Sequence, residues 1–156
     1  MSVQDIDRGW KRIRAEMRKM AGSYTKVGVQ SDAKRDDSAN AATVAAVHEF
    51  GGGNVPERSF LRSTMDENRE SIKKLVAAEK DAIFAGRSTV ERSLGLIGAW
   101  AVAKVQAKIR SRIPPPLAPS TLARRKNKDK SSVVPLIDTG QLIQSIRQVV
   151  VMGGRK

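Results

Sequence analysis

Residues Val44–Arg62 read VAAVHEFGGGNVPERSFLR, and the fold can be reasoned outward from them. This stretch holds the chain's single histidine, His48, beside a glutamate, and three glycines follow. Glycine takes positive φ angles at little cost and can end a helix sharply. Pro56 then disfavours helix in the residue before it. The stretch therefore predicts a helix over Ala41–Phe50, a sharp turn and an extended segment.

The same residues could instead belong to a chemical site, and three kinds were compared with the sequence. A zinc-protease motif needs a second histidine four residues after His48, but that position is Gly52 and the chain has no cysteine. A hydrolase triad would need a nucleophile motif such as GxSxG, which is lacking. The glycines also lack the spacing of a phosphate-binding loop. Catalysis by carboxylates alone stays open, but we predict an architectural corner with no metal or cofactor.

Elements near both ends of the chain follow from the spacing of apolar residues. A stripe at steps of four and three predicts an amphipathic helix that Gly22 ends: Ile6, Trp10, Ile13, Met17 and Met20. Alternation predicts a strand over Thr25–Val29, and β-branched residues predict another over Gln148–Val151. Neither strand has a partner nearby in the sequence, so we expect both in one sheet, against the helices.

The middle of the chain predicts two long helices, Met65–Ala85 and Thr89–Arg112. Three pairs of residues have the spacing of a capping box: Ser63 with Asp66, Thr64 with Glu67, and Ser88 with Glu91. The second helix is apolar on two faces, which predicts that it is buried centrally or shared with another subunit.

The last third of the chain is rich in proline and in basic residues. IPPPLAP, residues 113–119, predicts a stiff extended connector. Asp138, with Gln141 three residues later, predicts the start of a short helix. Polar, unpatterned composition predicts flexible loops over residues 31–40 and 126–132. We see no repeat or boundary, so residues 1–156 are expected to form a single domain.

Charge is the strongest feature of the composition. The chain has 29 Lys and Arg against 16 Asp and Glu, a net charge of +13. Nine bases and one acid lie between Lys104 and Lys130, so that window carries +8. Such a field favours polyanions, but a solvated basic face is an equal alternative. Aromatic residues are only 4% of the chain, which argues against sequence-specific recognition of nucleic acid.

The compartment follows from what the sequence lacks. Apolar runs are far shorter than the ~20 residues of a membrane span, and the first ten residues do not resemble a signal peptide. We expect no membrane contact, and a soluble protein that folds in the cytoplasm of the cell that makes it. The absence of cysteine suits a reducing compartment.

Two signatures in this order resemble a known family. The first is VAAVHEFGGGNVPERSFLR followed by MDENRESI, and the second is PPPLAPSTLARRKNKDKSSVVPLIDTGQLIQSI. Together they resemble the tail-completion, or virion-morphogenesis, proteins of tailed bacteriophages, over roughly residues 41–150. Ser59 is a departure, since the family often has a second proline there.

The resemblance implies a structural role and no enzymatic activity. Such proteins join a finished tail to a DNA-filled head, or complete the upper end of the tail, as subunits of a ring that commonly has six copies. The implied fold is α+β, with several helices, two of them long, packed on a small antiparallel sheet and with long extended loops. The implied partners are further copies of the chain, other neck and tail proteins, and genomic DNA in the channel. The implied location is the virion, after synthesis in the host cytoplasm.

Two sets of residues are the candidate contacts. For DNA or an acidic partner they are Arg124, Arg125, Lys126, Lys128 and Lys130. For neighbouring subunits they are the extended residues Val55, Pro56, Arg58, Phe60, Leu61, Pro114, Pro115, Pro116 and Leu117. The main alternative is a non-specific nucleic-acid-binding protein that acts as a monomer or dimer. A small nuclease that uses carboxylates and a metal is a weaker third class.

Overall fold

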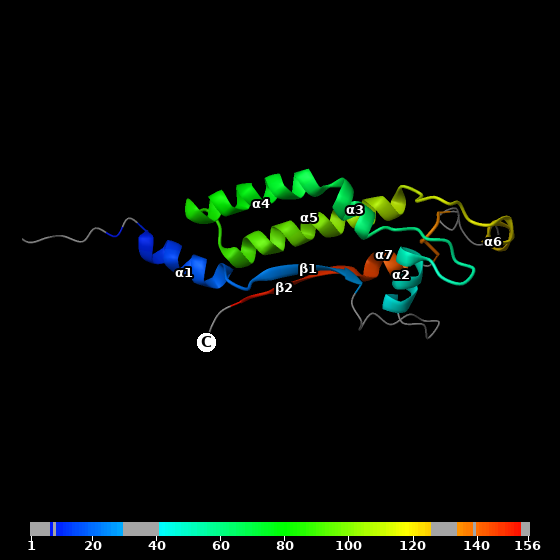
Figure 1. The fold of residues 1–156 in the computed structure, drawn as a ribbon, viewed down its shortest axis with the longest axis horizontal. Coiled ribbons are helices and arrows are strands. Elements are labelled where there is room, and N and C mark those ends of the chain that lie inside the picture. The colour runs from blue at the N-terminus through cyan, green and yellow to red at the C-terminus, as the bar shows by residue number, and fades with distance from the viewer. Residues whose placement is uncertain (1–6, 8, 30–40, 126–133, 139, 154–156) are drawn as a thin grey trace, which may run out of the picture. The chain divides into compact units, whose positions relative to one another are not determined.

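A computed structural model describes residues 7, 9–29, 41–125, 134–138 and 140–153 (Figure 1). The loops predicted over residues 31–40 and 126–132 lie outside the described residues. In chain order the elements are α1 Trp10–Met20, β1 Tyr24–Val29, α2 Ala41–Phe50, α3 Arg62–Glu67, α4 Arg69–Phe84, α5 Val90–Arg110, α6 Pro119–Arg125, α7 Gln141–Ser145 and β2 Ile146–Val151. Within the described residues, seven helices accompany one two-stranded antiparallel sheet, so the predicted α+β class is confirmed.

The chain divides into two compact units, each made of segments distant in sequence. Unit 1 comprises Met1–Lys26, Glu70–Gly98 and Val149–Lys156. Unit 2 comprises Val27–Arg69 and Ala99–Gln148. Because their segments alternate along the chain, no single position in the sequence could mark a boundary. The single domain expected from the sequence stays a prediction.

The sheet pairs the two strands expected from opposite ends of the chain. β1 and β2 are hydrogen-bonded neighbours, so this prediction is confirmed. Beyond β2, the N–H of Gly153 donates to Ser23 Oγ at 2.7 Å, close to the turn between α1 and β1. A Cβ at position 153 would lie 2.2 Å from the carbonyl oxygen of Ala21. Glycine is thus required there by space.

Unit 2 contains the hydrophobic core of the described residues. Phe60, Val105 and Ile109 are fully buried in it. Around them lie Ala45, Ile113, Leu136, Leu142, Ile143 and Ile146, and α2 packs against α7. The core therefore joins residues of both sequence signatures to the second half of α5.

In unit 1, α4 and the first half of α5 lie side by side (Figure 1). Ser93 of α5 donates to Glu79 of α4 at 2.7 Å and is almost fully buried. Ile83 and Val90 are the buried hydrophobic residues of this unit. A buried polar contact thus joins these two helices beside the apolar residues Ile83 and Val90.

The start of the first long helix differs from the prediction. One helix was expected over Met65–Ala85, but α3 begins at Arg62 and a break at Asn68 separates it from α4. The Asn68 side chain donates to the carbonyl of Thr64, which also accepts the helical N–H of Asn68, and this side-chain bond competes with continuation of the helix. The capping boxes of Ser63 and Thr64 are wrong. Their hydroxyls donate instead to the carbonyls of Ser59 and Phe60.

Two further helix starts also need correction. Ser88 does not cap α5, since its hydroxyl bonds with Ser93, while Thr89 Oγ1 accepts from the N–H of Arg92 at 3.3 Å. Asp138 does not cap α7. The residue before that helix is Gly140, at a φ of 80°, with no side-chain cap. Among the described helices, none is both long and apolar enough to cross a membrane.

Candidate functional site

The three glycines that follow α2 form a sharp turn. Gly51 ends the helix at a φ of +73°, which L side chains rarely adopt. Gly52 and Val55 then exchange two backbone hydrogen bonds of 3.0 Å. The chain returns so that the N–H of Arg58 donates to the carbonyl of His48 at 2.7 Å. The helix over Ala41–Phe50 and the sharp turn at its end, both predicted from the sequence, are confirmed.

Glu49 holds this corner closed, and we call its contacts the Glu49 clasp. Oε1 accepts from Ser59 Oγ at 2.7 Å and from the N–H of Arg62 at 2.8 Å. Oε2 accepts from the N–H groups of Phe60 and Leu61 at 2.8 and 2.9 Å. The carboxylate thus satisfies backbone donors at the start of α3 that would otherwise lack partners.

The clasp also sets the protonation state of Glu49. Burial alone would raise the pKa of this carboxyl group. The N–H groups of Leu61 and Arg62, the Ser59 hydroxyl and the N–H of Phe60 more than offset burial, so its pKa lies below its ordinary value. Glu49 is therefore held in its charged form as an acceptor for the start of α3.

Arg58 connects the first sequence signature to the second. Its Nε donates to the carbonyl of Pro115 at 2.7 Å, and Nη2 donates to that of Pro116 at 3.0 Å. The residue is only 5% exposed, and this burial lowers the pKa of its guanidinium. The guanidinium fork thus binds two consecutive carbonyls of the connector and holds it to the first signature.

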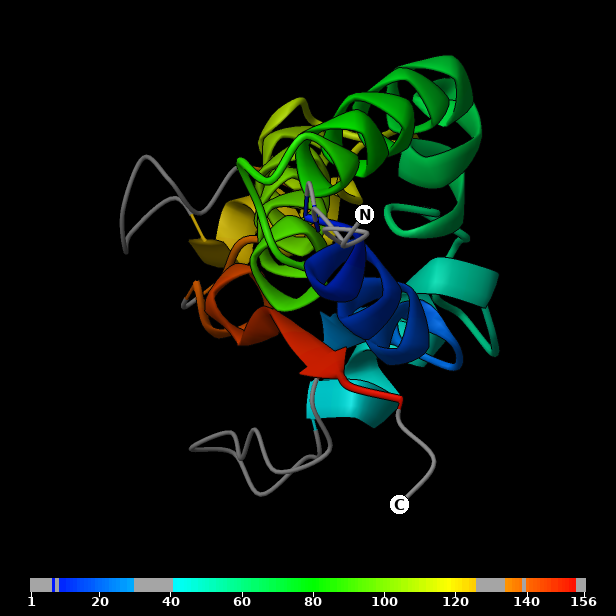
Figure 2. The ribbon, with the colours of Figure 1, turned by 90° about the vertical axis from the view of Figure 1, so that its left-hand side faces the viewer.

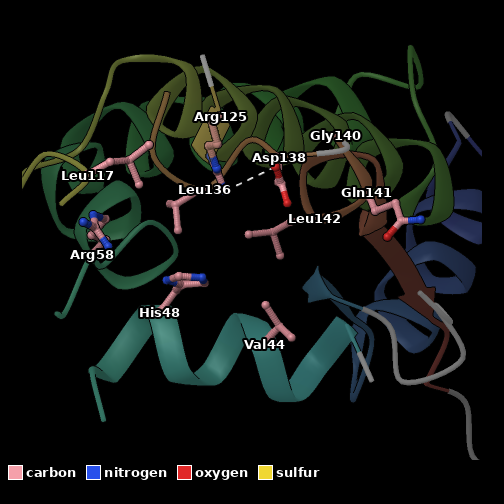
Figure 3. A pocket seen from close by; sticks show the side chains of 10 residues that line it. All are labelled: Val44, His48, Arg58, Leu117, Arg125, Leu136, Asp138, Gly140, Gln141 and Leu142. Atoms are coloured by element: carbon pink, nitrogen blue, oxygen red, sulfur yellow. Dashed lines mark ion pairs between the residues drawn. The ribbon is translucent and has the colours of Figure 1, made fainter. Parts of the chain in front are cut away.

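A pocket of about 160 Å³ lies beside Arg58 (Figure 3). Val44 and His48 enter it from α2, and Leu136 and Leu142 face them from the second signature. The remaining described lining residues are Arg58, Leu117, Arg125, Asp138, Gly140 and Gln141. Residues of both signatures, polar and apolar, therefore line this pocket.

The pocket is small for a substrate site. Pockets for small molecules usually measure about 300–1,000 Å³. None of the described lining residues is a serine or cysteine that could act as a nucleophile with His48. In the described part of the chain, no cluster of three or more His, Asp or Glu residues could hold a metal. The arrangement therefore offers packing and ion pairing more readily than chemistry.

The predicted basic contact set is divided by the structure. Arg125 lies at the end of α6, where it pairs with Asp138 at 3.4 Å and donates to the carbonyl of Ile137 at 3.1 Å. Its side chain is thus engaged within unit 2. The side chain of Arg124, and the whole of Lys126, Lys128 and Lys130, lie outside the described residues.

The predicted subunit-contact segments are also divided. Arg58 and Phe60 are buried within unit 2, and Leu61 packs against its core. Half-buried positions are Val55 and Leu117, and exposed positions are Pro56, Pro114, Pro115 and Pro116. The buried residues serve the fold of the chain itself, while the exposed prolines stay available to a neighbour.

Sequence reasoning missed two polar residues that organise unit 1. Arg12 donates to the carbonyls of Ile83 and Phe84, at the end of α4, at 2.9 and 3.0 Å. Glu16 is 6% exposed and accepts from the N–H of Val90, at the start of α5, at 2.9 Å. Both lie on the polar side of α1, where the pattern gives no sign of burial.

No family model matches this chain, and neither does any curated protein or solved structure. The only support for the family resemblance is therefore the residues of the two signatures and the contacts that they make.

Proposed function

We propose that this chain is a structural virion protein of the neck or upper tail of a tailed bacteriophage. It forms a ring, with six copies as the expected number, that completes the tail or joins it to the DNA-filled head. The observation that carries the proposal is the bridge from Arg58 to the carbonyls of Pro115 and Pro116. This bridge joins the two signatures on which the resemblance rests.

The way the signature residues are used supports a structural role. In an enzyme, such residues would be expected to point into a cleft that admits a substrate. Here Glu49 closes a turn, Phe60 fills the core and Arg125 pairs with Asp138. They specify a shaped body whose partners are other proteins, and the exposed Pro114–Pro116 segment is suited to contact a neighbouring subunit.

Purified virions provide the direct test. Phage that lack this protein should accumulate DNA-filled heads and separate tails in electron micrographs, and supplying the wild-type chain should restore joined particles. Quantitative mass spectrometry should find a fixed copy number, six per virion. Normal particles without the protein, or its absence from purified virions, would reject the proposal.

The charge of +13 favours a second candidate, a non-specific nucleic-acid-binding protein. The test replaces Arg124, Lys126, Lys128 and Lys130 by serine but keeps Arg125, whose pairing with Asp138 belongs to the fold. If these bases touch duplex DNA, the slope of log affinity against log salt should flatten by about 0.9 for each lost contact. Flattened slopes with normal joining would favour DNA as the partner, and failed joining with an unchanged slope would favour a protein.

A further inference from the structure

Four residues of the apolar stripe of α1 are described: Trp10, Met17 and Met20 are exposed, and Ile13 is half-buried. Trp10 is 58% exposed, Met17 49% and Met20 37%. An amphipathic helix of a soluble protein normally buries such a stripe against its own core. Here the stripe is available to another molecule.

Unit 1 holds α1 through residues of its polar side instead. Figure 2 shows the backbone of α1, in blue, beside the green helices α4 and α5 that receive these contacts. Arg12 binds the last carbonyls of α4, and Glu16 binds the first N–H of α5. These charges complement the partial charges at the two helix ends. Because Arg12 and Glu16 lie one helical turn apart, they fix α1 in a defined rotation, and that rotation leaves Trp10, Met17 and Met20 uncovered.

A third side of α1 carries a basic row, which we define as Lys11, Arg14 and Arg18. With Ala15, the row borders a hollow of about 190 Å³. None of the three cations has an ion pair with a carboxylate in the part of the chain that the structure describes. The apolar stripe is thus bordered by the contacts of Arg12 and Glu16 on one flank and by the basic row on the other.

We propose that the stripe and the basic row together bind an acidic amphipathic helix of a partner protein. Its apolar face covers Trp10, Met17 and Met20, and its carboxylates pair with the basic row. Apolar anchors at helical spacing with charges along one side are typical of helix recognition. This inference does not depend on the proposed role in a phage tail.

The charge distribution favours this occupant over three others. A second copy docked through the same stripe would bring its own Lys11, Arg14 and Arg18 to this surface, and the like charges would repel. A lipid surface is best met by a helix with cations on both flanks of its apolar face. One flank of α1 is instead occupied by its own contacts with α4 and α5. Duplex DNA would use the cations but would leave the apolar stripe in water.

The experiment uses the full chain with Trp100→Phe, which leaves Trp10 as the only tryptophan. The probe is a designed helical peptide with leucine on one face and glutamate along both borders of that face. Its matched control has lysine in place of glutamate. We expect the glutamate peptide to shift Trp10 emission to shorter wavelength with saturable binding, and the lysine peptide to leave it unchanged. Binding should weaken several-fold when salt rises from about 0.05 to about 0.5 M.

Variants of the surface sharpen the test. Met17→Ser, and separately Arg14→Ser with Arg18→Ser, should each weaken binding by at least about fivefold. Control variants are Phe50→Ser, an exposed aromatic residue of unit 2, and Arg69→Ser with Arg110→Ser, two exposed cations of unit 2. These should bind the peptide like the parent. Circular dichroism verifies that every variant keeps its helical content.

Four results would overturn the proposal. If the lysine peptide bound as tightly as the glutamate peptide, charge would not govern binding. If the unit 2 control variants weakened binding as much as the α1 variants, the binding surface would not be the one on α1. A wavelength shift on concentrating the protein alone would identify a second copy as the occupant. A shift with vesicles of anionic lipid, without one for the glutamate peptide, would identify a membrane.

Discussion

The two compact units differ in where their apolar side chains lie. Eleven of the thirteen buried hydrophobic residues that the structure describes belong to unit 2, the exceptions being Ile83 and Val90. Nine of the ten large hydrophobic residues that it describes as exposed belong to unit 1, the exception being Phe50. Unit 2 thus has the apolar core that stabilises a fold, whereas unit 1 leaves most of its large apolar side chains exposed.

The largest effect is expected when an aromatic residue is removed from each unit. Phe60→Ala should lower the free energy of unfolding by about 3–5 kcal/mol, because it leaves a cavity in the core of unit 2. Phe84→Ala in unit 1 should cost less than about 1 kcal/mol, since that ring is already 39% exposed. Denaturant unfolding measures both. If the two variants lost the same free energy of unfolding, the proposed difference between the cores of the two units would be wrong.

A smaller effect is expected from Glu49→Gln in the clasp. An amide has one oxygen in place of two, so two of the four donors to Glu49 lose their acceptor, and we expect a loss of about 2–3 kcal/mol at neutral pH. Glu16→Gln in unit 1 should cost less, because among the described residues Glu16 accepts from two donors, Lys19 and Val90.

The pH dependence of stability separates the charge from the shape of these side chains. The folded pKa of Glu49 is lowered, so its contribution is fully present above the unfolded pKa of about 4.3 and is lost as the pH falls through the lower folded pKa. The difference between wild type and Glu49→Gln should therefore shrink in acid. A difference that stays constant down to about pH 2 would contradict the charged clasp.

The smallest effect on stability is expected from a glycine substitution that tests a close backbone contact in unit 1. Gly153→Ala places a Cβ 2.2 Å from the carbonyl oxygen of Ala21, so the turn must shift, at a cost of about 1–3 kcal/mol. Its control is Gly95→Ala, where nothing lies within 4 Å of the new Cβ and α5 should gain about 0.5–1 kcal/mol. Hydrogen exchange at residues 21–23 should speed up in the first variant alone. Unchanged exchange would show that this close approach does not stabilise the unit.

The sequence predicted those parts of the fold that depend on near neighbours. The bounds of α2 and the positive φ of Gly51 follow from residues within a few positions of each other. The pairing of β1 with β2 also followed, because an isolated strand must find a partner for its backbone. For the candidate site, the pattern indicated an architectural corner but did not indicate its acceptor, Glu49.

The helix starts were predicted less well, for a physical reason. Ser63, Thr64 and Ser88 have the local spacing of caps, yet carboxylates from elsewhere satisfy N–H groups at the actual helix starts. Glu49 accepts from Phe60, Leu61 and Arg62, so α3 begins before Ser63, and Glu16 accepts from Val90 at the start of α5. Glu49 lies 13 residues from Arg62, and Glu16 lies 74 residues from Val90. A charged acceptor brought close by the fold makes a stronger hydrogen bond than a hydroxyl, and local spacing gives no information about it.

The sequence by itself determined which segments are helical or extended, where glycine must turn the chain, and which side of α1 is apolar. These properties depend on backbone preferences and on the spacing of side chains within one element. Only the tertiary structure decided that Arg125 pairs with Asp138 and that the apolar side of α1 stays exposed. A pattern shows which face of a helix could be buried, but burial itself depends on what the rest of the chain places against that face.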